Sequence, residues 1–305
     1  MAAITRSVPY QAPTPVKING IETVYDIFGH AADPPLVLVA GLGMQMIGWD
    51  ERLCAQLAGC GYRIIRFDNR DVGLATSFKD KGVPDVGRLI QTRLAGEPPQ
   101  IPLPYTTYDI VADTIALFDE LELDQVHLLG ISMGGIIAEL LTIEHQERVK
   151  TLTAVMTTTG SPALPLPRPE ALGIFMRPPS KSRAEYIENS VQGWRMLYGS
   201  AYPLDEEETR LRAGRYYDRS YEPTGTTRQL AATIALESLK PRLGQITVPT
   251  LVIHGDEDPL FPIECGRDIA VSVPNAKMLV MEGVGHSLPP AIWPQIIEAI
   301  AKHAV

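Results

Sequence analysis

Ser132 lies between glycines in the stretch "HLLGISMGGIIAEL" (127–140), as part of a Gly-x-Ser-x-Gly motif. An apolar run precedes the motif, and an apolar pattern of helical period follows it. A serine on such a sharp strand-to-helix turn has strained backbone geometry and presents its hydroxyl above the sheet, as a nucleophile requires. Close packing of a helix on a strand would also explain the glycines, but it gives no reason for the serine. Because so short a motif also arises by chance, its partners decide its meaning.

A serine hydroxyl is a weak nucleophile and needs a neighbouring base. Of the six histidines, His286 is the best placed, because "MEGVGHSLPP" puts it on a glycine-rich turn after the last apolar run. Such a turn reaches the carboxyl edge of a sheet. His127 and His145 fall in an expected strand and helix and are interpreted as structural, and His303 as solvated near the C-terminus. We expect His254, at a strand end, to be packed or hydrogen-bonded.

A carboxylate must hold the tautomer of that histidine and stabilise its charged form. The stretch "TLVIHGDEDPLFP" offers Asp256, Glu257 and Asp258 at the end of the preceding strand, and the residues alone leave the choice open. A metal ion would need more oxygen ligands than this short turn presents. We therefore expect neither a metal nor a cofactor.

Two backbone N–H groups would receive the negative charge that develops on a substrate carbonyl oxygen. One is expected from Met133, which follows the serine at the start of the helix. The other is expected in "VLVAGLGMQMIGWD", where a strand ends in a glycine-rich turn. Leu42 occupies the place between two glycines there and is the expected donor.

Seven short runs rich in β-branched residues predict the sheet that must position these groups. The expected strands are 22–28, 35–41, 62–68, 126–132, 151–157, 250–256 and 276–282. Most are too apolar to have one face in water, which is typical of a parallel sheet covered on both sides. Helical patterns alternate with the strands at 50–61, 108–123, 134–149 and 292–305. This alternation predicts an α/β protein with a doubly wound, mostly parallel sheet.

The alternation stops between residues 158 and 245. We expect this region to be a helical cap, or lid, inserted before the last two strands, with 1–157 and 246–305 as the core. Clustered prolines at 160–180 predict no regular elements. Helical patterns follow at 181–199, 204–220 and 226–238.

Two features of the cap bear on its role. Phe175, Trp194, Met196 and Tyr198 could wall a pocket above Ser132 or form the core of the cap itself. The acidic run "DEEE" (205–208) is interpreted as a helix N-terminus with Asp205 near the cap position, because acidic side chains favour the first turn.

The composition of the chain indicates which binding partners to exclude and which cell compartment to expect. The 305 residues are 45% hydrophobic and carry a net charge of −9, with no basic stripe for a nucleic acid. No apolar run is long enough to span a membrane, and the N-terminus lacks the apolar region of a signal peptide. Three cysteines without metal-type spacing are expected to be reduced thiols. We expect a cytoplasmic protein, and its oligomeric state is left open.

The order of serine, acid and histidine resembles that of the α/β-hydrolase superfamily, over nearly the whole chain. The segments "IIRFDNRDVGLAT" (64–76), "LLGISMGG" (128–135), "QGWRMLYGSAYPLDEEE" (192–208), "VPTLVIHGDEDPLFP" (248–262) and "EGVGHSLP" (282–289) are similar to the aclacinomycin methylesterase-type serine hydrolases. The resemblance implies an α/β-hydrolase fold with Asp258, before proline, as the acid. The cap differs over 158–185, so the substrate does not follow.

We therefore expect an esterase in which Ser132 attacks a small-molecule carboxylic ester, His286 acts as base and Asp258 orients it. Three other activities use the same triad: lactone hydrolysis, C–C bond hydrolysis and perhydrolase chemistry. A protein of this fold that binds a ligand without turnover is the alternative outside enzymes.

Overall fold

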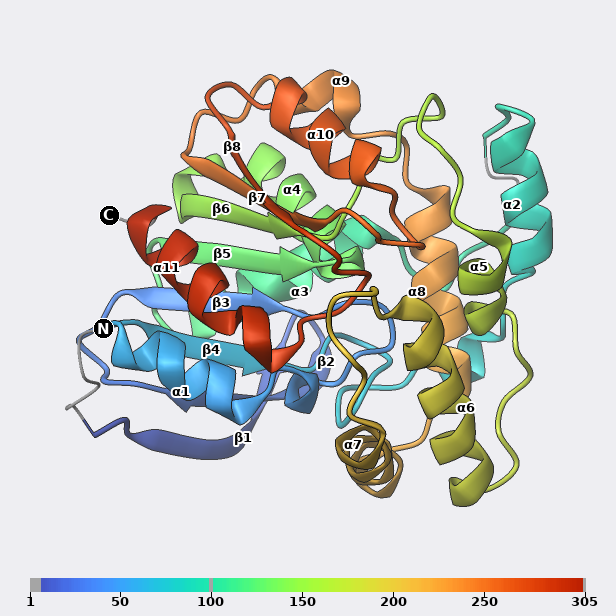
Figure 1. Cartoon of the computed structure of the whole chain (residues 1–305), viewed down its shortest axis with the longest axis horizontal. Coiled ribbons are helices and arrows are strands. Elements are labelled where there is room, and N and C mark those ends of the chain that lie inside the picture. The colour runs from blue at the N-terminus through green and yellow to red at the C-terminus, as the bar shows by residue number, and fades with distance from the viewer. Residues whose placement is uncertain (1–6, 99–100, 304–305) are drawn as a thin grey trace.

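A computed structural model describes residues 7–98 and 101–303 of the chain (Figure 1). Its centre is an eight-stranded sheet in the order β1-β2-β4-β3-β5-β6-β7-β8. The strands are β1 Tyr10–Ile18, β2 Ile21–Phe28, β3 Pro35–Val39, β4 Arg63–Phe67, β5 Val126–Ile131, β6 Val149–Val155, β7 Thr250–Gly255 and β8 Lys277–Met281. The first two pairings, β1 with β2 and β2 with β4, are antiparallel, and all later ones are parallel. The predicted α/β-hydrolase fold class is confirmed.

Helices cover both faces of the sheet (Figure 1). They are α1 Glu51–Gly59, α2 Val86–Leu94, α3 Thr107–Glu120, α4 Met133–Glu144, α5 Pro169–Phe175, α6 Arg183–Leu197, α7 Glu206–Arg219, α8 Pro223–Ala235, α9 Lys240–Leu243, α10 Ile263–Ser272 and α11 Trp293–His303. Apolar side chains of α3, α4 and α10 pack in one buried cluster with the sheet, and those of α1 and α11 pack in a second. Burial of apolar surface on both sides explains why the central strands read as almost continuous apolar runs.

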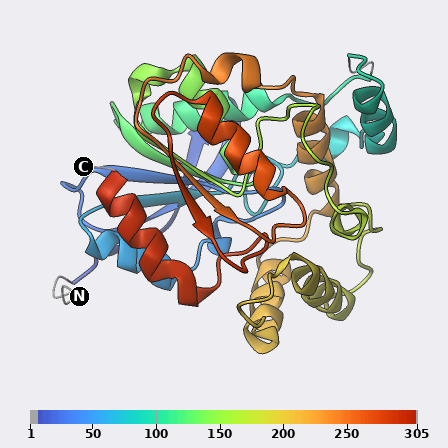
Figure 2. The same ribbon diagram turned by 45° about the horizontal axis from the view of Figure 1, so that its top comes forward.

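Helices α5 to α8 lie beyond the carboxyl ends of the parallel strands, on the right side of Figures 1 and 2. All four come from the chain between β6 and β7. In α/β sheets, ligands bind outside the carboxyl ends of the strands. These helices are therefore placed over the edge of the sheet where chemistry is expected.

Several features depart from the expectations drawn from the sequence, among them helices α2 and α10, which lie outside the predicted helical patterns. The proline-rich stretch does contain a helix, because Pro169 opens α5 at a position where its missing N–H costs nothing. Strand β1 was not predicted, because as an edge strand it has a mostly exposed, polar pattern. His303 is buried and its Nε2 lies 3.2 Å from the carbonyl oxygen of Leu152, so the expectation of a solvated side chain is wrong.

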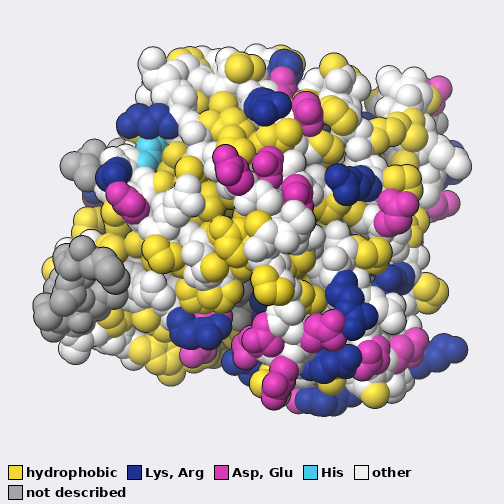
Figure 3. Space-filling model, viewed as in Figure 1, with side chains coloured by type: hydrophobic (Ala, Val, Ile, Leu, Met, Phe, Trp, Pro, Cys, Tyr) yellow, Lys and Arg dark blue, Asp and Glu magenta, His cyan; other side chains and the backbone are white. Residues whose placement is uncertain are grey.

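The surface over α6 and α7 carries charges of both signs, seen at the lower right of Figure 3. Arginines and acidic residues pair there across the two helices, as in the ion pairs of Arg183 with Asp218 and Arg195 with Glu206. Such exposed pairs keep the helices soluble and add little stability. No helix in residues 7–98 and 101–303 combines the length and apolar character needed to cross a membrane.

Candidate active site

Ser132 occupies a strained turn between β5 and α4, with φ 55° and ψ −123°. Residues other than glycine rarely adopt a positive φ, and such backbone strain persists only where the surrounding structure enforces it. Here the N–H of Ser132 donates to the carbonyl oxygen of Val155 at 2.9 Å. The carbonyl of Ser132 accepts from Oγ1 of Thr157 at 2.8 Å. Strand β6 and the residues after it therefore hold the serine in place.

The glycines of the motif allow backbone to approach backbone at this turn. A Cβ at Gly130 would lie 2.0 Å from the carbonyl oxygen of Gly134, and a Cβ at Gly134 would lie 2.1 Å from that of Val39. Both distances are far inside van der Waals contact, so only glycine fits at either position. The start of α4 is thereby pressed against the end of β3. The motif can therefore serve both the tight packing of the helix on the sheet and the placing of the Ser132 hydroxyl at the turn.

His286 lies on the loop after β8, and its backbone N–H donates to the carbonyl of Leu197 at 2.7 Å. Its Nδ1 atom lies 2.7 Å from Oδ2 of Asp258. The other oxygen, Oδ1, accepts from the N–H groups of Leu260 and Phe261, both at 2.8 Å. Because a carboxylate oxygen accepts hydrogen bonds, the imidazole tautomer that fits this pair has its proton on Nδ1 and its lone pair on Nε2.

The other two acidic residues of the same turn have different partners. Asp256 accepts from the N–H of Gly283 at 2.7 Å. The carboxylate of Glu257 accepts from both the N–H and the hydroxyl of Ser200, at 2.6 Å each. Of the three acids that the sequence offers, only Asp258 has a hydrogen bond to His286 among the described residues.

His254 lies next to Asp258 and bonds to the turn that carries it. Its Nε2 lies 2.7 Å from the carbonyl oxygen of Phe261 and 3.8 Å from Oδ2 of Asp258. Burial lowers the pKa of the His254 imidazole, which keeps it neutral. The ring of Phe261 in turn meets the ring of His286 edge to face, with centroids 5.7 Å apart. His254 thus fixes the turn that carries Asp258, as a hydrogen-bonded residue and not as a base.

The remaining histidines lie elsewhere. Nδ1 of His127 is 2.9 Å from the hydroxyl of Thr151 on the neighbouring strand. His145 ends α4 and is partly exposed. Among the described residues, neither histidine has a hydrogen bond or ion pair with Ser132 or Asp258, which agrees with the structural roles expected for them.

Backbone N–H groups are available for an oxyanion at two places. Met133 is the first residue of α4, where N–H groups have no acceptor within the helix and the helix dipole favours negative charge. Leu42 lies in a turn closed by the bond from the N–H of Met44 to the carbonyl of Gly41, at 3.1 Å. Within the part of the chain that the structure describes, neither the Leu42 nor the Met133 N–H donates to another protein group.

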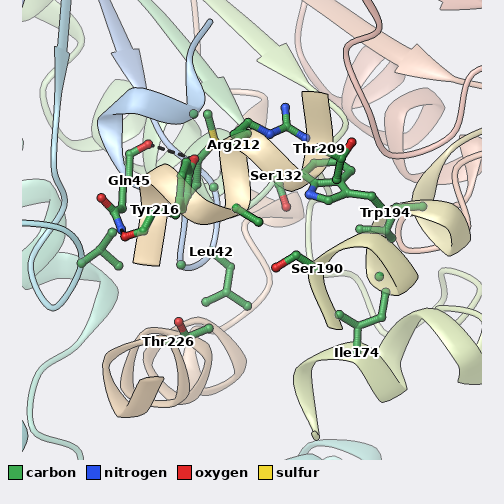
Figure 4. Close-up of a pocket in the computed structure, with 18 of the residues that line it drawn as sticks. Leu42, Gln45, Ser132, Ile174, Ser190, Trp194, Thr209, Arg212, Tyr216 and Thr226 are labelled. Atoms are coloured by element: carbon green, nitrogen blue, oxygen red, sulfur yellow. Dashed lines mark hydrogen bonds between the residues drawn. The ribbon is translucent and has the colours of Figure 1, made fainter. Parts of the chain in front are cut away.

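Ser132, Leu42 and His286 line one pocket of about 580 Å³ (Figure 4). Phe175, Trp194 and Tyr198 from the helices over the sheet line it too, whereas Met196 does not. Arg212 of α7 also faces the pocket, with its guanidinium 4.8 Å from the centre of the Trp194 ring. A pocket of this volume holds a small organic molecule.

The acidic run at 205–208 caps a helix, as expected. Oδ1 of Asp205 accepts from the N–H of Glu208 at 3.0 Å, at the start of α7. A capping side chain that satisfies an otherwise free N–H stabilises the helix by about 1 kcal/mol.

A family model described as the alpha/beta hydrolase fold matches residues 34–289. The chain is 28% identical over 297 residues to the rhodomycin D methylesterase DauP of Streptomyces sp. (strain C5), with 90% of this chain and 92% of that protein covered. The expected resemblance to methylesterase-type hydrolases is thereby confirmed.

Solved structures share the fold. A meta-cleavage product hydrolase from Pseudomonas fluorescens IP01 has a TM-score of 0.73 at 18% identity, covering 95% of this chain and 96% of that one. The enol-lactonase from Burkholderia xenovorans LB400 has a TM-score of 0.70 at 21% identity, covering 95% of this chain and 99% of that one. At these identities the likeness extends to the fold alone.

Proposed function

The chain belongs to the alpha/beta hydrolase fold family, and we propose that it is a serine esterase that cleaves carboxylic esters through an acyl-enzyme. The observation that carries the proposal is the 2.7 Å pair of His286 and Asp258 at the pocket that also contains Ser132. Its methylesterase relative, aligned over most of both chains, supports ester hydrolysis as the reaction.

In this mechanism Ser132 attacks the ester carbonyl while Nε2 of His286 takes the proton of its hydroxyl. Asp258 keeps the proton on Nδ1 and stabilises the imidazolium that forms. The N–H groups of Leu42 and Met133 donate hydrogen bonds to the carbonyl oxygen. These bonds strengthen as negative charge develops on that oxygen in the tetrahedral intermediate. His286 then protonates the leaving alcohol, and water hydrolyses the acyl-enzyme by the same route in reverse.

We further propose that residues 158–245 act as a cap over a core formed by 1–157 and 246–305. Helices of this segment supply Phe175, Trp194 and Tyr198 to the pocket wall. Aromatic side chains there would cover an apolar part of the substrate and exclude water from the reacting carbonyl.

A screen of esters tests the proposed function. Esters of p-nitrophenol with acyl chains of two to eight carbons vary the acyl side of the scissile bond, and butyrate esters of methanol, butanol and phenol vary the alcohol side. We expect a rapid burst of alcohol release followed by a slower steady rate, because an acyl-enzyme accumulates. The absence of turnover on every ester, with tight binding of one of them, would favour a ligand-binding protein instead.

A further inference from the structure

Gln229 of α8 is fully buried and contacts the turn that contains Leu42. Its Oε1 accepts from the N–H of Gly43 at 2.9 Å, and its Nε2 donates to the carbonyl of Arg70 at 2.8 Å. An N–H only donates and a carbonyl only accepts, so these two partners fix the orientation of the amide. Burial makes the loss of either bond costly, because a polar group would be left without water or partner.

The contact with Gln229 decides which N–H of the turn is free. The N–H of Met44 donates to the carbonyl of Gly41, and that of Gly43 donates to Gln229. Leu42 keeps its N–H for a ligand, since no protein acceptor within the described residues uses it. A side chain of the expected cap therefore selects the donor on the core.

Helix α8 is fixed to the core on the same side. The guanidinium of Arg228 makes two bonds of 2.8 Å to the carboxylate of Asp71, and both side chains are buried. A Cβ at Gly43 would lie 2.7 Å from Oγ1 of Thr226, so the helix packs directly against the turn. Figure 4 shows Leu42 between Thr226 of α8 and Ser132. Helix α8 therefore packs directly on the Gly41–Met44 turn and is held to the core beside it.

We propose that Gln229 is a positioning residue, which holds the Gly41–Met44 turn so that the N–H of Leu42 faces the oxyanion. It acts through the backbone and does not touch the substrate. This inference rests on the proposed function, because it assigns Gln229 a part in stabilising a tetrahedral intermediate. An oxyanion donor counts most when charge is fully developed, so its misplacement lowers kcat more than it raises KM.

The test compares two variants. Gln229→Met removes both hydrogen bonds and keeps a side chain of similar length, whereas Gln229→Glu keeps an acceptor for the N–H of Gly43. Gln125→Met is the matched control, since Gln125 is exposed and its side chain donates to the carbonyl of Glu147 at the surface. For each variant we would measure kcat and KM on p-nitrophenyl butyrate and the inhibition constant of an alkyl trifluoromethyl ketone. The hydroxyl oxygen of a serine adds to the carbonyl carbon of this ketone, and the product is a stable tetrahedral adduct with an oxyanion.

We expect Gln229→Met to lower kcat about 10- to 100-fold and to weaken the ketone by a similar factor, with KM changed by less than about threefold. Gln229→Glu should lie between this variant and the wild type, and Gln229→Leu, which also lacks both bonds, replaces Gln229→Met if that variant does not fold. A kcat and ketone inhibition within about twofold of wild type in the folded variant that lacks both bonds would overturn the inference. A loss of kcat without weaker ketone binding would overturn it as well. A wild type that neither hydrolyses esters nor binds the ketone would instead refute the proposed function.

Discussion

Nδ1 of His286 lies 2.7 Å from Oδ2 of Asp258, while Oδ1 of the same carboxylate accepts two backbone N–H groups at 2.8 Å. The carboxylate therefore cannot rotate away from the imidazole without breaking both backbone bonds. A base held in this way spends no free energy on finding its orientation when the substrate arrives.

Replacing Asp258 tests the acid of the proposed triad. Asp258→Asn should lower kcat by about 10⁴, because an amide would favour the wrong tautomer of His286. Asp256→Asn is the matched control two residues away, and it should retain nearly full activity, since an amide oxygen can still accept from Gly283. Steady-state kinetics on p-nitrophenyl butyrate compares them. The assignment is wrong if only Asp256→Asn loses activity.

Replacing Gly134 tests the close packing behind Ser132. The methyl group of Gly134→Ala would collide with the carbonyl oxygen of Val39, so we expect a loss of about 1–3 kcal/mol in the free energy of unfolding. Gly173→Ala is the control, because no atom lies within 4 Å of its added Cβ and alanine favours a helix. Urea unfolding of both variants measures the difference. Equal stability of the two would contradict the packing described here.

The buried carboxyl of Glu139 in α4 should make the free energy of unfolding depend on pH above 4.5. Burial raises the pKa of its carboxyl well above the usual 4.5, and neither of its oxygens has a hydrogen-bond partner among the described residues. The folded state thus keeps a proton that the unfolded state releases above pH 4.5. The free energy of unfolding should therefore fall as pH rises from 4.5 towards the folded pKa.

The variant Glu139→Gln removes this proton and should lose less stability than the wild type between pH 5 and pH 8. Urea unfolding at both values measures the slopes. Glu298→Gln, an exposed residue that pairs with Lys302, is the control and should leave the slope of the wild type nearly unchanged. Parallel slopes in wild type and Glu139→Gln would show that Glu139 is not the group responsible.

His127 gives the opposite dependence on the acid side. Burial in the sheet lowers the pKa of its imidazole to about 4. The unfolded state takes up a proton below pH 6.5, the usual pKa, whereas the folded state stays neutral until about pH 4. Stability should therefore be lost as pH falls through this window, and His127→Gln should lose less of it. Thermal unfolding between pH 7 and pH 4.5 provides the measurement; identical losses would contradict the prediction.

Much of the fold follows from the sequence, because buried parallel strands leave unbroken apolar runs. Ser132 and His286 could be predicted from their place at the ends of such runs. Asp258 could not be separated from Asp256 by spacing, since the two carboxylates lie on one short turn. They differ in their partners in the folded chain, which are His286 for Asp258 and the N–H of Gly283 for Asp256.

Other features had no pattern to reveal them. Gln229 lies in an ordinary helical pattern, and its importance arises from Gly43, far away in the chain. Helix α5 departs from the prediction because proline breaks the interior of a helix but is tolerated at its first position, where Pro169 stands. His303 is buried although it lies near the C-terminus, because α11 packs its apolar face on the sheet.

The most direct test of the nucleophile is labelling by an alkyl fluorophosphonate with mass spectrometry, together with hydrolysis of p-nitrophenyl butyrate, in wild type and Ser132→Ala. Ser190→Ala, at another serine that lines the pocket, serves as the control. We predict that the wild type and Ser190→Ala are labelled on Ser132, and that Ser132→Ala is unlabelled and loses about 10⁶ in kcat. A purified, folded Ser132→Ala that still hydrolyses the ester at the wild-type rate would contradict the proposal that Ser132 is the nucleophile.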